Sequence, residues 1–230
     1  MIVITRSLPD TALAQKLSQH RYFRGVTGDQ LQELAAAARC YALAAGEVLF
    51  WEGEPSAGLW LIQAGRVKIF KVSPEGNEHI LHLVGPGDSC NDIAALDGGP
   101  NPANAAALSE VIACCLPHTA LRAAIMADPQ LAMTVIQVLT GRTRELVQQV
   151  EDLALHSVTT RLARFLLKQL ENPALSGPSI TRTAIAAHLA TTPETLSRAL
   201  SALERAGIIA TERSAIRVLR EDLLRMMAMQ

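Results

Sequence analysis

The spacing of apolar residues changes along the chain, and each change predicts a different kind of structure. Residues 10–39 carry apolar positions at helical spacing, interrupted by Gly25 and Gly28, and predict short helices. From Tyr41 the apolar runs become short and rich in Val, Ile and aromatic residues, with Gly or Pro clusters between them. The predicted strands are Glu47–Trp51, Leu59–Gln63, Arg66–Val72, His79–Val84 and Val111–Leu116. Short strands at regular spacing predict a sandwich or barrel.

After Pro129 the pattern turns helical for about 25 residues, which is long for a globular protein. Eight positions follow the 4-3 spacing of a coiled-coil seam, and most of them are apolar. They are Ala132, Ile136, Leu139, Thr143, Leu146, Val150, Leu153 and Ser157. Val135 and Val138 lie on a neighbouring face. We therefore expect this helix both to pack on its own barrel and to form a homodimer.

The C-terminal part carries the start and stop signals of short helices. Residues 158–170 predict an amphipathic helix, and a loop with two prolines and a glycine follows. Thr181 is expected to cap a first short helix. Thr192 is expected to cap a second, because Pro193 at its first position has no N–H to lose. That helix is predicted to end at Gly207, and two short strands around a polar turn then predict a wing.

The second short helix has two chemically different faces. Its apolar face is formed by Leu196, Ala199, Leu200 and Leu203, which are expected to pack against the first helix. Glu194, Ser197 and Arg198 lie on the opposite face, where a helix-turn-helix presents side chains to the major groove. Arg can bond guanine, Glu can accept from cytosine, and Ser can contact bases or phosphate. The alternative is a solvated face with an intrahelical Glu194–Arg198 pair.

Further residues around this helix are predicted to contact the DNA backbone. They are Arg182, Thr183, Thr192 and Arg213.

The order of barrel, long helix and winged helix-turn-helix resembles the CRP/FNR superfamily of bacterial transcription regulators over nearly the whole chain. The motifs that carry the resemblance are Ile180-Thr181-Arg182 and Pro193-Glu194-Thr195-Leu196-Ser197-Arg198. It implies an α+β fold with a cyclic-nucleotide-binding-like jelly-roll barrel that senses an effector (1–127), a long dimerisation helix (128–157) and a C-terminal winged helix-turn-helix (158–230). It also implies a homodimer that binds double-stranded DNA and RNA polymerase. Because Glu194, Ser197 and Arg198 match the E-x-x-S-R arrangement of the FNR branch, it further implies a TTGAT-like inverted repeat.

The resemblance also bears on cyclic AMP. The family's nucleotide cassette aligns with residues 87–92 and 100–105, where Asp92 takes the position of the carboxylate for the ribose. Pro102-Ala103 replaces the Arg-Ser pair, and a buried phosphate without a cation is costly. Cyclic AMP is therefore disfavoured, unless Arg66 or Arg142 of the partner subunit supplies the charge.

Haem is a further candidate effector. Within the family the chain is most similar to the Dnr-type, nitric-oxide-responsive denitrification regulators, on His20-Arg21-Tyr22-Phe23, Leu31-Gln32-Glu33-Leu34 and the motif at 193–198. This similarity suggests His20 and His188 as haem ligands. For the histidines the alternative is a residue that only caps a helix or lies at the surface. For the effector the alternatives are an unliganded or other small-molecule sensor, a cyclic nucleotide, or thiol redox.

Cysteine usage argues against an iron–sulfur cluster, because no cysteine precedes Cys40. Cys114 and Cys115 are adjacent in a predicted strand, so they point to opposite sides and are expected to be buried and structural. We expect thiols in a reducing compartment and no zinc site.

Charge and motifs narrow the class of protein. Residues 1–156 hold 11 basic and 16 acidic side chains, and 157–230 hold 10 basic and 6 acidic side chains, so the basic excess lies where DNA binding is predicted.

The sequence shows no catalytic carboxylate pair, triad, P-loop or dinucleotide motif, so we expect no enzyme. It also shows no secretory signal or membrane span, so we expect a cytoplasmic location. The competing function is a cyclic-nucleotide-binding module that acts on a partner protein.

Overall fold

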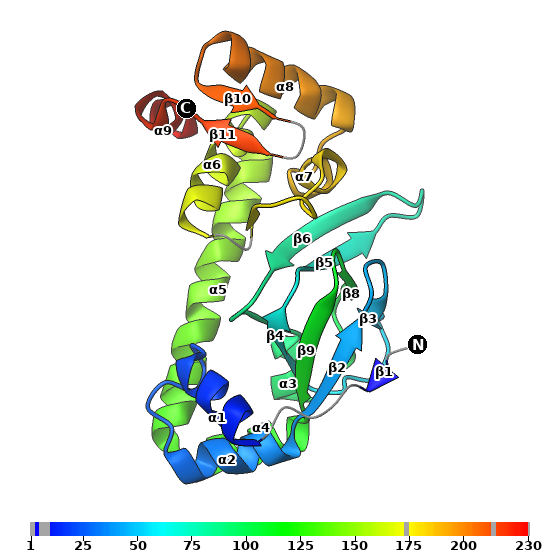
Figure 1. Cartoon of the computed structure of the whole chain (residues 1–230), viewed down its shortest axis with the longest axis vertical. Coiled ribbons are helices and arrows are strands. Elements are labelled where there is room, and N and C mark those ends of the chain that lie inside the picture. Colours follow the sequence, from blue (N-terminus) through cyan, green and yellow to red (C-terminus); the bar gives the residue numbers. More distant parts are fainter. Residues whose placement is uncertain (1–2, 5–9, 173–174, 213–214, 230) are drawn as a thin grey trace. The chain divides into compact units, whose positions relative to one another are not determined.

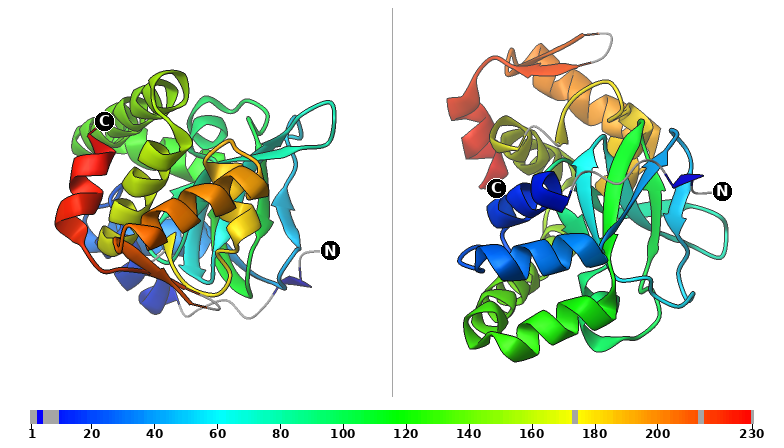
Figure 2. Two further views of the ribbon diagram at one scale, coloured as in Figure 1. Left: turned by 90° about the horizontal axis from the view of Figure 1, so that it is seen from above. Right: turned by 60° about the horizontal axis from the view of Figure 1, so that its bottom comes forward.

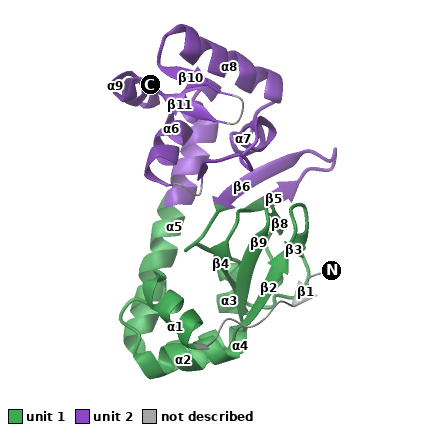
Figure 3. Ribbon diagram, in the orientation of Figure 1, with its two compact units in different colours: residues 1–69, 84–144 green, residues 70–83, 145–230 purple. Residues whose placement is uncertain are grey.

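The computed structural model of the chain describes residues 3–4, 10–172, 175–212 and 215–229. The chain divides into two compact units (Figure 3). Unit 1 comprises Met1–Ile69 and Val84–Arg144, and unit 2 comprises Phe70–Leu83 and Glu145–Gln230. The two units are defined by contacts between residues, whereas the three predicted domains were defined by the sequence pattern. The division into three domains stays a prediction.

The N-terminal strands form a sandwich of two sheets (Figure 1). Their bounds are β1 Val3–Ile4, β2 Arg39–Leu43, β3 Val48–Phe50, β4 Leu59–Ala64, β5 Val67–Val72, β6 Glu78–Val84, β7 Ser89–Cys90, β8 Asn104–Ala107 and β9 Val111–Leu116. One sheet has the order β1-β2-β9-β4-β7 and the other β3-β8-β5-β6. The recorded pairings are antiparallel. The five strands predicted from sequence are confirmed, and β1, β2, β7 and β8 are additional.

Two glycines allow β4 to lie against β9. Gly58 and Gly65 flank β4 and have φ of +138° and +81°. A Cβ atom at either position would lie 2.0 Å from a carbonyl oxygen, that of Leu116 or that of Glu110. Only glycine therefore permits both the backbone conformation and the close approach.

Helices cover one side of the sandwich in unit 1. They are α1 Asp10–Gln19, α2 Gly28–Ala37, α3 Asp92–Asp97, α4 His118–Ala127 and the first part of α5, Pro129–Leu155. The core joins Leu131 and Val135 of α5 to residues of α1, α2, β4 and β9, and Val138 packs against it. The long helix and its packing on its own barrel are therefore confirmed.

One cysteine pair differs from the sequence expectation. Cys40 and Cys114 form a disulfide, although we expected thiols. The register of β2 and β9 places these two residues directly opposite each other, which sequence spacing alone does not reveal. The predicted burial is confirmed, because Cys114 and Cys115 are 0% and 4% exposed.

The C-terminal part of unit 2 is a helix-turn-helix with a two-stranded wing. Its elements are α6 Val158–Glu171, α7 Arg182–His188, α8 Pro193–Arg205, β10 Ile209–Thr211, β11 Ile216–Val218 and α9 Glu221–Ala228. Its core contains Leu162, Phe165, Leu166, Leu196, Leu203 and Leu224. Figure 2 shows α9, which the sequence analysis did not predict, alongside α6. The predicted fold class is confirmed.

Among the described residues, no single helix is long and apolar enough to cross a membrane. Helices α4 and α5 reach that length and apolar character only when taken together, and the chain bends by 118° between them.

Candidate nucleic-acid interface and sensor site

Local capping signals define the two helices of the motif as the sequence predicts. The Thr181 hydroxyl caps α7 by accepting a hydrogen bond from the backbone N–H of Ala184 (3.1 Å). The Thr192 hydroxyl caps α8 by accepting one from the N–H of Thr195 (3.3 Å), and Pro193 is the first helical residue. Both caps satisfy N–H groups that a helix start leaves without partners, so each helix begins where its threonine lies.

The two faces of α8 are separated as expected. Leu196, Ala199, Leu200 and Leu203 are buried, and α8 contacts both α6 and α7. Glu194, Ser197 and Arg198 are all exposed on the other face. Burial of the apolar face fixes the rotation of α8 about its axis, so these three polar side chains are held together on one surface.

Thr195 also contributes to this surface, which was not predicted from the sequence. Its hydroxyl accepts a hydrogen bond from Nη2 of Arg198 (3.0 Å) and another from the hydroxyl of Thr192 (3.2 Å). A hydrogen bond from its own backbone amide and one from Thr192 lower the pKa of Glu194. The N-terminal turn of α8 therefore carries an oriented cation beside a carboxylate that favours its ionised form.

Three of the four residues predicted to contact the DNA backbone are exposed. Arg182 and Thr183 are exposed in the first turn of α7, and Thr192 is exposed at the cap of α8. Arg213 lies outside the described residues.

Helix α5 presents apolar side chains to solvent in both of its halves. Exposure is 51% for Ile136, 46% for Leu146, 66% for Val150 and 44% for Leu153. Leu139, which the seam pattern also includes, packs against the core of unit 1. The helix therefore uses one face for its own sandwich, and no other described residue covers its second apolar face.

Asp92, which aligns with the carboxylate that binds the ribose in this family, forms an ion pair within unit 1. It is 3% exposed and pairs through Oδ2 with Nη1 of Arg142 on α5. Nη2 of Arg142 donates to the backbone oxygen of Ser89 (3.0 Å) and to its hydroxyl (3.2 Å), and that hydroxyl donates to Oδ1 of Asp92 (3.3 Å). Arg142 of the same protomer thus balances the charge of Asp92, whereas the sequence suggested Arg66 or the partner's Arg142 as a cation for the phosphate.

Neutral groups occupy the place of the family's Arg-Ser pair. Pro102 is exposed and Ala103 is buried. The neighbouring loop is held by a hydrogen bond from Nδ2 of Asn91 to Oδ1 of Asn101 (2.9 Å). This loop supplies no positive charge for a phosphate group.

The two predicted haem ligands lie in different units and have different tautomers. In unit 1, Nδ1 of His20 accepts a hydrogen bond from the N–H of Tyr22 (3.3 Å), so the proton is on Nε2, which is buried. In unit 2, Nδ1 of His188 bonds the carbonyl oxygen of Ile80 (3.1 Å), so the proton is on Nδ1 and Nε2 has the free lone pair. Burial lowers the pKa of each to about 4, so both rings are neutral at pH 7.

The free cysteines do not form a reactive site. Cys90 and Cys115 are buried, and burial raises the pKa of both, that of Cys115 to about 12. Over the part of the chain that the structure describes, no group of three His, Cys, Asp or Glu side chains could hold a metal ion.

Both halves of the chain match known protein families. Residues 42–128 match the cyclic nucleotide-binding domain, and residues 160–227 match the Crp-like helix-turn-helix domain. The match to a Crp-like helix-turn-helix domain does not favour the competing function, a cyclic-nucleotide-binding module that acts on a partner protein.

Relatives and solved structures agree with these matches. The chain is 29% identical over 207 residues to the CRP-like cAMP-activated global transcriptional regulator of Mycobacterium tuberculosis, covering 87% of this chain and 92% of that protein. It is 31% identical to the cyclic AMP receptor protein of Thermus thermophilus, covering 71% and 76%. Its fold is similar to that of FixK2 from Bradyrhizobium japonicum, with a TM-score of 0.75, 24% identity and coverage of 83% and 96%. The chain therefore belongs to the CRP/FNR family of DNA-binding transcription regulators and is not an enzyme.

Proposed function

We propose that this chain is a homodimeric regulator that reads a TTGAT-like inverted repeat through Glu194, Ser197 and Arg198. The observation that carries the proposal is the exposed polar face of α8 opposite its buried leucines. Arg198 is suited to bidentate bonds with guanine, Glu194 to accepting from cytosine, and Ser197 to a flanking base or phosphate. Arg182, Thr183 and Thr192 then contact phosphates, and the regulator acts in the cytoplasm with RNA polymerase.

Fluorescence anisotropy on a TTGAT inverted repeat and a scrambled duplex tests this proposal. Arg198→Ala should cost about 1–3 kcal/mol on the repeat and much less on scrambled DNA. Arg205→Ala is the matched control, because Arg205 is an exposed arginine at the far end of the same helix. Equal losses on both duplexes would contradict direct reading of the bases.

The dimer is proposed to form through the exposed apolar face of α5. Val150 belongs to the predicted seam, whereas Val147 does not, yet the two side chains are similarly exposed at 66% and 63%. Val150→Glu should therefore dissociate the dimer in sedimentation equilibrium, because it places a charge in the seam. Val147→Glu should leave the dimer intact, and dissociation by both variants or by neither would contradict this interface.

The effector is proposed to be a small molecule other than cyclic AMP, although both relatives above are named for cyclic AMP. Asp92 already has its charge balanced by Arg142, and the cation of the aligned Arg-Ser pair is missing. Cyclic AMP would therefore bury a phosphate without a free counter-charge. Isothermal titration with cyclic AMP should show no binding, and micromolar affinity would refute this exclusion.

Haem with a response to nitric oxide is the specific effector to test, and the two histidines differ in how well they fit it. A metal-bound histidine usually donates its other ring N–H to a carbonyl or carboxylate, as His188 does to Ile80. His20 carries its proton on the nitrogen that would bind iron. The pocket beside His188 has a volume of about 60 Å³, well below the roughly 300–1,000 Å³ of a ligand pocket. The described arrangement therefore does not fit haem at either histidine without a rearrangement.

Titration of the purified chain with haem tests this candidate. A Soret shift that is lost in His188→Ala and kept in His20→Ala would support a site at His188. An unchanged Soret band would remove haem as the effector.

A further inference from the structure

The helix that carries the dimer face is joined to the DNA-binding helices through a very short connection. α5 ends at Leu155 and α6 begins at Val158. The hydroxyl of Ser157 caps α6 by accepting a hydrogen bond from the N–H of Thr160 (3.2 Å). Two residues thus redirect the chain, and a connection of this kind needs tertiary contacts to fix its angle.

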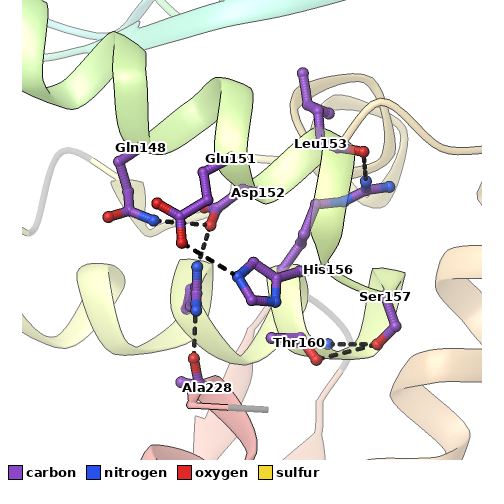
Figure 4. Close-up of polar contacts among 10 residues, drawn as sticks. Gln148, Glu151, Asp152, Leu153, His156, Ser157, Thr160 and Ala228 are labelled. Carbon is purple, nitrogen blue, oxygen red and sulfur yellow. Dashed lines mark hydrogen bonds and ion pairs between the residues drawn. The ribbon is translucent and has the colours of Figure 1, made fainter.

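One arginine supplies such contacts on both sides of the connection. Nη1 of Arg164, on α6, forms an ion pair with Oδ1 of Asp152 on α5, and Nε of Arg164 donates to the backbone oxygen of Ala228 in α9 (2.7 Å). Nε2 of Gln148 donates to the same oxygen of Asp152 (3.2 Å), and Figure 4 shows Gln148 and Asp152 joined in this way. A single side chain thereby connects three helices.

The Arg164–Asp152 ion pair is mostly buried, so it should contribute more to stability than an ion pair at the solvated surface. The side chains of Arg164 and Asp152 are 21% and 15% exposed. Ala228 lies in the last turn of α9, where a helix leaves carbonyl oxygens without internal partners. Loss of the guanidinium therefore removes the partner of a mostly buried carboxylate and of a helix-end carbonyl at once.

We propose that Arg164 is a positioning residue that fixes the direction in which α5 enters the DNA-binding helices and so sets the half-site separation that the dimer accepts. The proposal rests on the proposed function, because it needs two half-sites read by two protomers. Neighbouring base pairs are about 3.4 Å apart along the duplex, so one added base pair both shifts and rotates a half-site. A stiff junction accepts one separation, and a loosened junction accepts several.

Selection from a pool of random duplexes tests the proposal without assuming a target sequence. The wild-type chain should enrich an inverted repeat with one separation between half-sites. Arg164→Met keeps the aliphatic stem and should enrich the same half-site at several separations. In binding assays its preference for the best separation over a change of one base pair should fall at least fivefold. Lys168→Met, at an exposed position one turn later on α6, should behave as wild type.

The outcomes separate this proposal from the function on which it rests. If the wild type enriches a repeat other than TTGAT, the half-site assignment fails, and the role of Arg164 is measured on the repeat that it does select. A single narrow separation for Arg164→Met, or a changed half-site sequence, would overturn the positioning role. If Arg164→Met does not fold, Asp152→Asn removes only the charge of the pair and should broaden the accepted separations to a smaller extent. An Asp152→Asn variant as selective as wild type would then overturn the role, and enrichment of single half-sites by the wild type would overturn both proposals.

Discussion

Replacing Arg142 by methionine should lower the free energy of unfolding by about 3–5 kcal/mol, the range for removing one partner of a buried ion pair. Asp92 is 3% exposed, and Arg142 is its cationic partner. Methionine keeps most of the aliphatic stem, so little of the loss is due to packing. The remaining hydrogen bond from Ser89 is too weak to balance a buried carboxylate.

The double variant separates charge from packing. Asp92→Asn combined with Arg142→Met removes both charges while keeping the shape of the carboxyl group. We expect this double variant to be more stable than Arg142→Met alone by at least about 1 kcal/mol, because no unpaired charge remains. Additive losses would instead indicate that the two side chains act independently.

Urea unfolding followed by the fluorescence of Trp60 measures these free energies of unfolding. Trp60 lies in unit 1, the unit that also contains Asp92 and Arg142. It is 3% exposed and contacts the rings of Tyr41 and Phe50. The protomer concentration must be fixed, because a dimer makes the apparent stability concentration-dependent. A loss below about 1 kcal/mol for Arg142→Met, or a double variant less stable than the single one, would refute the reasoning.

Two further predictions concern pH and backbone conformation. Burial lowers the pKa of His20 and of His188 from 6.5 to about 4, so the unfolded chain binds more protons between these values, and stability should fall by about 2 kcal/mol per histidine from pH 7 to pH 5. In urea unfolding at pH 7 and pH 5, His188→Gln should lack the part of the fall in stability that is due to His188. A fall as steep as that of the wild type would contradict this assignment. Gly65→Ala should cost about 1–3 kcal/mol more than Gly76→Ala, because both glycines have positive φ but only the first would place a Cβ against the oxygen of Glu110. Equal unfolding midpoints would contradict this close approach.

The motif helices could be predicted from sequence because their signals are local. Thr181 and Thr192 lie immediately before the helices that they cap, and Pro193 and the leucines of α8 follow within a few turns. The winged helix-turn-helix and the polar face of α8 therefore needed no long-range information. The orientation of Arg198 by Thr195 could have been found from their i, i+3 spacing.

Other features depend on residues far apart in the chain. β8 consists of Asn104–Ala107, which has low strand propensity, and it is a strand because it lies between β3 and β5 in its sheet. The Cys40–Cys114 disulfide spans 74 residues and requires the register of β2 and β9. No local pattern contains such information.

The ion pair of Arg142 with Asp92 has a consequence for any ligand of the sensor. Arg142 lies on α5, two residues before the limit of unit 1. A ligand that uses the Asp92 carboxylate must take the place of Arg142 or provide a cation of its own. In the first case ligand binding and the attachment of α5 to the sandwich are mutually exclusive, so the ligand shifts the population in which α5 is attached. In the second case α5 stays attached, and binding at Asp92 has no means of reporting through Arg142. The double-mutant cycle of Arg142→Met and Asp92→Asn measures the coupling between the two side chains, so it sets the least differential affinity that an effector acting through Asp92 must have.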